Sequence, residues 1–299
     1  MKTFWLLVKR NMKLFFNDKG MFITSLITPM ILLVLYITFL GNVYRDSLIQ
    51  NFEMIEISEK VIDGIVSGQL VSSILAVSCV TVAFCSNFLM VQDKAVGTIK
   101  DFTISPVKSN TLSISYYVAS LFSTLIICLS ATVVCLIYLA IAGWYLSIID
   151  VLLIFVDVIL LVLFGTILSS IINYFLSTLG QISAVGTVVS SVYGFVCGAY
   201  MPLSTFPDVL QKVLSFLPGT YGTSLLREHT MNGALKALEE ELPLEFQSSV
   251  SGAKDSFDIN LYFFGNEVSH EMKFIILGGS ILLLIVVYLL LNKYKRKKA

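Results

Sequence analysis

The chain has 299 residues, of which 56% are hydrophobic and 13% are charged, and its twenty basic residues balance its twenty acidic ones. Its mean hydropathy of +0.85 lies well outside the range of soluble globular proteins and excludes that class. Apolar stretches as long as those in this chain need the lipid bilayer as their solvent. The composition therefore predicts an integral membrane protein.

Six stretches can each supply the ~20 apolar residues that cross a ~30 Å hydrocarbon layer. They cover residues 21–41, 69–91, 113–142, 151–172, 181–201 and 273–292. All five cysteines fall within these stretches, where we expect them to be packing residues and not disulfide partners or metal ligands. The sequence therefore predicts an all-α membrane protein in which residues 1–299 form one domain with six transmembrane helices.

The first element, residues 1–20, is too short and too charged to span a membrane. At helical spacing the basic residues share one face, and most of the aromatic and aliphatic side chains share the opposite one. The basic residues are Lys2, Lys9, Arg10 and Lys13. This pattern is typical of an amphipathic helix that lies in the membrane interface. A cleaved signal peptide is the alternative, but the sequence offers no A-x-A cleavage site.

Between the second and third predicted spans, residues 92–110 form a charged segment, "QDKAVGTIKDFTISPVKSN", within otherwise apolar sequence. The connections that follow the third and fourth spans are much shorter, "GWYLSIID" and "NYFLSTLGQ". Helices joined so closely must satisfy their own backbone in the bilayer. We therefore expect two tight helical hairpins after the charged segment.

The fifth predicted span carries a small residue at every fourth position: Gly186, Ser190, Gly194 and Gly198. These positions share one helix face, and small side chains let two helices approach closely. The face favours pairing of two copies of the chain. Packing within one subunit is the alternative.

Residues 202–272 form the longest polar segment. The stretch "TFPDVLQKVLSFL" has apolar residues at helical spacing, with Thr205 as a possible cap and Pro207 at the first helical position. It predicts a short amphipathic helix on the membrane surface or dipping into it. Residues 233–272, with glutamates at 239, 240 and 241, predict a solvated subdomain.

The positive-inside rule places both termini in the cytoplasm. With residues 1–20, 92–110 and 293–299 inside, that side carries thirteen of the twenty basic residues and three of the twenty acidic ones. Residues 202–272 are then extracellular. The charge distribution therefore predicts an N-in, C-in topology.

Groups that could support catalysis are sparse. The two histidines, His229 and His270, both lie in the polar segment 202–272, and no glycine is followed by a lysine, so a GxxxxGK[ST] phosphate loop is absent from the sequence. Asp157 is the one acidic residue within a predicted span. It is either a proton or substrate site or a carboxylate that reaches interfacial water or a neighbouring hydroxyl.

Two motifs in this topology resemble the permease subunits of type-two ATP-binding-cassette (ABC) exporters. The first is "QDKAVGTIKDFTISPV", and the second is "CGAYMPLSTFPDVLQKVLSFLPGTYGTSLLR" after the fifth span. The resemblance covers residues 1–230 and 273–299. It departs from the family where the third span begins, because "SISYYVAS" lacks the Gly-Lys that members often have there.

The resemblance implies roles for particular residues. In such permeases the first loop docks into the ATPase, and the second and fifth helices lie close to the central path. The implied ATPase-coupling residues are Asp93, Lys94, Gly97, Thr98, Lys100, Asp101, Phe102, Ser105 and Pro106, with Phe102 as the apolar anchor. The implied path residues are Phe84, Phe88, Tyr193, Phe195 and Thr187, and the outer re-entrant segment carries Pro202, Pro207, Pro218 and Tyr221.

We therefore expect the membrane subunit of an ATP-driven exporter in a bacterial plasma membrane. The expected partners are ABC ATPase subunits, a second identical or paralogous permease and membrane lipid, with no nucleic acid. ATP and magnesium would bind in the ATPase, and we expect no metal, cofactor or catalytic residue in this chain. The expected cargo is hydrophobic or amphipathic, and the alternative cargo is a lipid-linked cell-wall glycan. The alternative function is that of a membrane scaffold or receptor that acts through the acidic outer segment.

Overall fold

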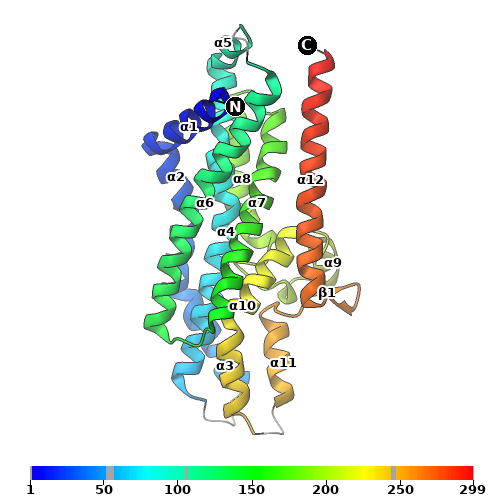
Figure 1. Ribbon diagram of the computed structural model, residues 1–299. Coiled ribbons are helices and arrows are strands. Elements are labelled where there is room, and N and C mark those ends of the chain that lie inside the picture. Colours follow the sequence, from blue (N-terminus) through cyan, green and yellow to red (C-terminus); the bar gives the residue numbers. More distant parts are fainter. Residues whose placement is uncertain (1, 52–56, 105–106, 244–246, 299) are drawn as a thin grey trace.

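The computed structural model describes residues 2–51, 57–104, 107–243 and 247–298. Nearly all of these residues are helical, and most helices run roughly along one axis (Figure 1). The first half contains α1 (Lys2–Asn17), α2 (Lys19–Leu35), a π-helical turn (Tyr36–Leu40), α3 (Gly41–Asn51), α4 (Glu59–Val96), α5 (Thr98–Ile104) and α6 (Ser109–Ala142). The second half contains α7 (Ile148–Phe175), α8 (Leu179–Val196), a 3-10 turn (Leu203–Thr205), α9 (Asp208–Leu214), α10 (Pro218–Glu241), α11 (Gln247–Ser256), β1 (Tyr262–Phe263), β2 (Asn266–Glu267) and α12 (His270–Lys298).

Six helices in the described part of the chain are long and apolar enough to cross a membrane. They are Lys19–Asp46, Glu59–Val96, Asn110–Ala142, Ile148–Phe175, Leu179–Val196 and His270–Lys293. The prediction of an all-α protein with six membrane helices is confirmed. The helix over 59–96 is much longer than the predicted 69–91: its 38 residues extend about 57 Å at 1.5 Å per residue.

The extra turns of α4 are helical because α10 covers them. A Cβ atom added at Gly68 would lie 2.8 Å from the carbonyl oxygen of Thr230, and one added at Gly64 would lie 3.2 Å from the Cβ of Ala234. Val61, Ile62 and Ile65 are buried in the same contact. Hydropathy alone predicts a start for this helix that is ten residues too late, because the partner of residues 59–68 is another helix and not lipid.

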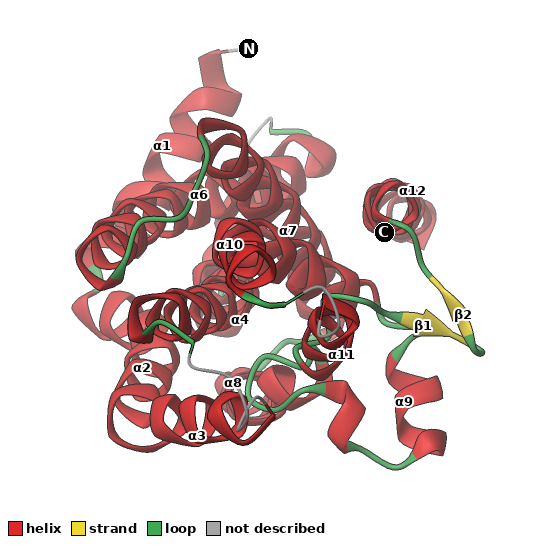
Figure 2. Cartoon of the chain, turned by 90° about the horizontal axis from the view of Figure 1, so that it is seen from below, coloured by secondary structure: helices red, strands yellow, loops and turns green. Residues whose placement is uncertain are grey.

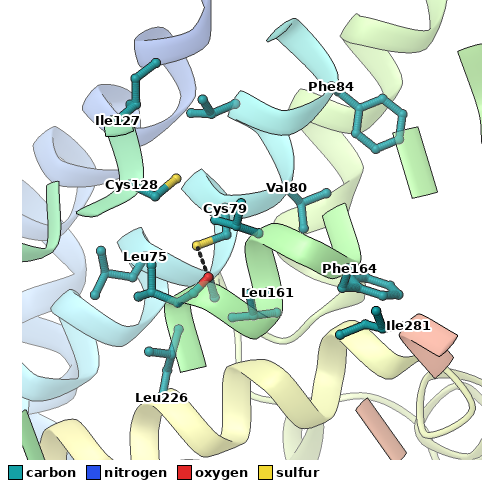
Figure 3. Packing of buried hydrophobic residues seen from close by; sticks show 14 of the residues in the cluster. Leu75, Cys79, Val80, Phe84, Ile127, Cys128, Leu161, Phe164, Leu226 and Ile281 are labelled. Carbon is teal, nitrogen blue, oxygen red and sulfur yellow. Dashed lines mark hydrogen bonds between the residues drawn. The ribbon is translucent and has the colours of Figure 1, made fainter. Parts of the chain in front are cut away.

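The core is built around α4, which packs against α2, α6, α7, α8 and α10 and lies inside the ring of other helices when the bundle is viewed along its axis (Figure 2). Figure 3 shows Cys79 of α4 among Leu75, Val80 and Leu161, with its Sγ 3.9 Å from the carbonyl oxygen of Val158. The five cysteines are all free thiols. Small side chains on α4 therefore let several helices approach it.

Part of the outer segment differs from the sequence prediction. Thr205 belongs to the 3-10 turn and does not cap α9, and Pro207 is the cap residue, not the first helical residue. Residues 218–241 form a single helix in which Ala234, Leu235 and Leu238 are buried, so the start of the predicted solvated subdomain is wrong. Periodicity in the sequence shows an apolar stripe, but it does not show that α4 and α7 cover it.

Both termini lie at the same end of the bundle as α5 (Figure 1), as an even number of spans requires. We call this end the inner end. The opposite end, where α3 and α11 lie, is the outer end. That the inner end is cytoplasmic stays a prediction from the charge distribution.

The close approach of α7 to α4 gives a first test. A Cβ atom added at Gly165 would lie 2.9 Å from the carbonyl oxygen of Cys79, and backbone cannot move aside as a side chain does. We expect Gly165→Leu to destabilise the fold by at least the ~1–3 kcal/mol typical of overpacking and to lower the thermal midpoint in detergent. Gly278→Leu on α12, where a Cβ atom would meet nothing within 4 Å, is the matched control; equal midpoints for the two variants would contradict this packing.

Candidate functional site

The segment between α4 and α6 makes a sharp turn at Gly97. This glycine ends α4 in the left-handed conformation, with φ of +91°, and its N–H donates to the carbonyl of Lys94. Glycine is the residue best suited to this cap, because it has no Cβ to clash. Thr98 then begins α5, which projects from the inner end of the bundle (Figure 1).

Asp93 fastens this segment to two other helices. Its carboxylate lies 2.6 Å from the Arg10 guanidinium of α1 and accepts a hydrogen bond of 2.5 Å from the Tyr116 hydroxyl of α6. Burial alone lowers the pKa of Arg10, but the contacts with Asp93 and Tyr116 outweigh burial and raise it. The guanidinium therefore stays charged, and the amphipathic helix α1 is held against the base of the loop.

Lys94 fastens the segment to α7. Its Nζ donates to the carbonyl oxygens of Asn173, Tyr174 and Leu176, at 2.9, 3.1 and 3.0 Å. These carbonyls are at the C-terminus of α7, where no following turn of helix supplies N–H groups to them. The Lys94 ammonium group supplies the missing donors. The structure thus places Asp93 and Lys94 against the bundle, although the resemblance suggested contacts with a partner.

The surface of this segment is formed by other residues. Val96 is 76% exposed and Ile104 is 86% exposed, and Lys100 and Asp101 are also exposed. Phe102 is half-buried, with the Arg10 guanidinium 5.2 Å from its ring centroid. Ile104, and not Phe102, is therefore the most exposed apolar side chain of α5. The predicted Ser105 and Pro106 lie outside the described residues.

A large apolar groove runs between α2 and α3 on one side and α8 on the other. Its volume is about 1540 Å³, and its lining residues include Ile27, Ile31, Phe88, Thr187 and Phe195. Three of the predicted path residues, Phe88, Thr187 and Phe195, thus come together here. The described lining residues include aspartates but no lysine or arginine.

The other two predicted path residues lie elsewhere. Phe84 is 2% exposed within the core. The Tyr193 hydroxyl approaches α10, where a Cβ atom added at Gly219 would lie 2.6 Å from it. These two side chains therefore pack helices together and are not part of the groove's described lining.

The small face of α8 divides into two parts. Gly186 and Ser190 line the groove. Gly194 is covered by the ring of Tyr200 of the same chain, and Gly198, with φ of +77°, would place a Cβ atom 3.2 Å from Asp258 Oδ2. Packing within one subunit accounts for the second part, and pairing through Gly186 and Ser190 stays a prediction.

A buried ion pair organises the segment after α8. Arg227 of α10 is 1% exposed; it lies 2.9 Å from Asp258 and donates to the carbonyl of Gly198. Asp258 also accepts hydrogen bonds from the backbone N–H groups of Leu203 and Ser204, at 2.6 and 3.2 Å. Burial raises the pKa of Asp258, although Arg227 and these N–H groups oppose the shift.

The predicted prolines and tyrosine lie in the connection from α8 to α10 and at the start of α10. Pro202 precedes the 3-10 turn, Pro207 precedes α9, and Pro218 is in the first turn of α10, where its missing N–H costs nothing. Tyr221 is buried, and its hydroxyl donates to the carbonyl of Ser215 at 2.6 Å. They shape the connection from α8 to α10.

The structure also brings together residues that the sequence analysis treated separately. Asp157 of α7 is fully buried, and its Oδ2 lies 2.5 Å from Nδ1 of His229 on α10. The His229 ring is 5.3 Å from that of His270, which pairs with Glu228 at 3.0 Å. The apolar stripe of residues 218–241, which includes His229, could have indicated this pairing. That inference requires knowing that these residues form one helix packed against α7.

The outer end of α7 is fixed to α10 by a second contact. Ser147 and Asp150 form a capping box at the start of α7, and Asn232 donates to the Asp150 carboxylate at 2.8 Å. With the Asp157–His229 pair, this contact joins the two helices at two levels.

Together, the six apolar helices, the loop fastened at the inner end and the apolar groove define a multi-pass membrane transport protein. The sequence model described as "ABC-2 type transporter" matches residues 2–230. The chain belongs to this family: it is a membrane-spanning permease component of an ABC transporter, and its partner is an ABC ATPase subunit. Comparisons with curated proteins and with solved structures gave no match.

The Asp157–His229 pair gives a second prediction. Removing one partner of a buried hydrogen-bonded pair leaves the other without a partner and costs about 1–3 kcal/mol or more, whereas replacing both partners with apolar residues is often nearly neutral. We expect Asp157→Leu to lower the thermal midpoint strongly and Asp157→Leu with His229→Leu to recover most of the loss.

The matched control is Asp63, which pairs with Arg45 at 2.6 Å but has 45% of its side chain exposed. Exposed pairs contribute ~1 kcal/mol or less, so Asp63→Leu should change the midpoint little. If the losses from Asp157→Leu and His229→Leu simply add in the double variant, the two residues do not act as a pair.

Proposed function

We propose that this permease exports a hydrophobic or amphipathic compound, such as a drug or an antimicrobial peptide, across a bacterial plasma membrane. The groove between α2, α3 and α8 is the observation that carries the proposal, because it is large, mostly apolar and free of lysine and arginine among its described lining residues. An apolar or amphipathic molecule loses little hydration on entering such a groove.

A polyanionic cargo fits this groove poorly. Moving charged phosphates out of water costs several kcal/mol unless cations or hydrogen-bond donors replace the hydration. Among the lining residues that the structure describes, the charged ones are Asp18 and Asp255, which would repel an anion. Export of a lipid-linked cell-wall glycan is therefore the less favoured alternative.

The work of transport would come from a separate subunit that binds ATP and magnesium. In this proposal α5 enters a cleft of that subunit, with Ile104 as the apolar anchor and Lys100 and Asp101 setting the register. Movement of α5 would reach the bundle through Asp93 and Lys94, since these side chains contact α1, α6 and α7. A second permease, identical or paralogous, would face the groove side of α8.

The coupling role of α5 gives the third prediction. Truncating an exposed isoleucine that becomes buried at an interface removes about 1.4 kcal/mol or more of binding, so Ile104→Ala should weaken binding of the ATPase about tenfold and lower substrate-stimulated ATP hydrolysis. Ile148→Ala is the control, because Ile148 is 82% exposed at the outer end. If the Ile104→Ala variant binds the ATPase normally and shows normal substrate-stimulated ATP hydrolysis, α5 is not the docking element.

The groove gives the fourth prediction. Thr187→Trp would fill part of it and should raise the substrate concentration needed for half-maximal ATPase stimulation by roughly tenfold, a difference of about 1.4 kcal/mol. Val188→Trp is the control: Val188 is the next residue on α8 and is 59% exposed, but does not line the groove.

The cargo itself can be tested with reconstituted complexes. We expect hydrophobic and amphipathic compounds to stimulate ATP hydrolysis more than lipid-linked polyanions do. Stimulation by lipid-linked polyanions alone would falsify the proposed substrate class, while equal effects of Thr187→Trp and Val188→Trp would show that the groove is not the cargo site.

A further inference from the structure

The hairpin before α12 exposes a cluster of aromatic rings. Strands β1 and β2 pair Tyr262 with Glu267 and Phe263 with Asn266. Phe263, Phe264 and Phe216 form edge-to-face pairs with ring centroids 4.9 to 5.8 Å apart. We call these three phenylalanines the aromatic cluster. Phe216 is 63% exposed and Phe264 is 56% exposed, so much of the cluster faces outward from the protein.

The backbone at the tip of the hairpin shows that this exposure has a cost. Phe264 has φ of +50° and Gly265 has φ of +84°. Tight hairpin turns with two positive φ angles strongly favour Asn, Asp or Gly, and positive φ is strained for a bulky residue. A phenylalanine at this position in water combines backbone strain with an exposed ring. An apolar environment around the ring would offset both the backbone strain and the cost of exposing the ring to water.

The position of the cluster identifies that surrounding. β2 ends at Glu267, and the part of α12 that is long and apolar enough to cross a membrane begins at His270. Figure 1 shows α9 and the hairpin beside the outer end of α12, whereas α11 and α3 extend further along the axis. Figure 2 shows α9 and the hairpin on the perimeter, outside the ring of helices. The cluster therefore lies at the edge of the bundle, at the level where a span begins.

The helices near the cluster also carry exposed apolar side chains. Val209 and Val213 of α9 are 76% and 56% exposed, and Met272 and Ile275 in the first turns of α12 are 47% and 62% exposed. The same face of α12 continues into exposed leucines in mid-span. Exposed apolar side chains therefore lie both on α9 and on the first turns of α12, the two helices next to the hairpin in Figure 1.

We propose that the aromatic cluster is a membrane anchor that inserts into the interfacial region of the outer leaflet. Aromatic rings are enriched at this boundary, where an apolar body sits below a wet surface. The partner is the phospholipid itself. The anchor would hold the segment between α8 and α12, including the buried Arg227–Asp258 pair, at a fixed depth beside the bundle.

The experiment uses the full-length permease in phosphatidylcholine vesicles. Trp5 and Trp144, the two native tryptophans, are replaced by phenylalanine, and Phe264→Trp supplies a single fluorophore. Its quenching is measured with lipids brominated near the headgroup end or near the middle of the acyl chain, and separately with aqueous iodide. Phe263→Trp serves if Phe264→Trp does not fold.

Two further single-tryptophan variants calibrate depth. Leu283→Trp lies on α12, where Leu283 is 66% exposed in mid-span, and Ser251→Trp lies on the exposed side of α11. We expect Phe264→Trp to be quenched severalfold more by the shallow bromines than Ser251→Trp, and to be several times less sensitive to iodide. Leu283→Trp should respond best to the deeper bromines.

Two outcomes would overturn the anchor. Iodide quenching of Phe264→Trp equal to that of Ser251→Trp would place the cluster in water. Shielding from both the bromines and iodide would place it under a protein partner. The result is independent of ATP hydrolysis and cargo, so it stands or fails separately from the proposed function.

Discussion

Burying a polar side chain away from water is costly unless it forms a hydrogen bond, and α4, the helix buried inside the bundle, places several of its polar side chains against partners on neighbouring helices. Asn87 donates to the hydroxyls of Ser169 and Ser170 on α7, at 3.0 and 2.6 Å, and Ser86 shares a hydrogen bond of 2.9 Å with Thr124 on α6. These bonds fix the register of α6 and α7 on α4. The fastened loop, the groove and the buried pairs all take their positions from helices packed on α4.

The membrane helices could be predicted from the sequence because apolar length alone defines a span. Their ends could not, since Glu59–Gly68 is held in a helix by α10 and not by lipid. The prediction for the connection from α8 to α10 was wrong for a similar reason. Thr205 has the chemistry of a cap, but Asp258, more than fifty residues later, bonds the nearby backbone and sets the turn.

The sequence was sufficient to predict which segments form the candidate site, but not which way each side chain points. The motif locates the loop at 92–110, but the direction in which each residue points depends on tertiary partners that are distant in sequence. Asp93 turns to Arg10, and Lys94 turns to the end of α7. Phe88, Thr187 and Phe195 line the groove, whereas Phe84 and Tyr193 do not, since they lie on helix faces that point into the packed core. A role of the first three in transport stays a prediction.

The capping of α7 by Lys94 has a mechanical consequence. At its inner end α7 is tied to the loop that carries α5, and at its outer end Asp150 and Asp157 tie it to α10. Its 28 residues make a rod of about 42 Å that resists compression because its backbone bonds are internal. A displacement of the loop would therefore reach the outer end of the protein as a translation of α7, with no change of conformation needed between the two ends.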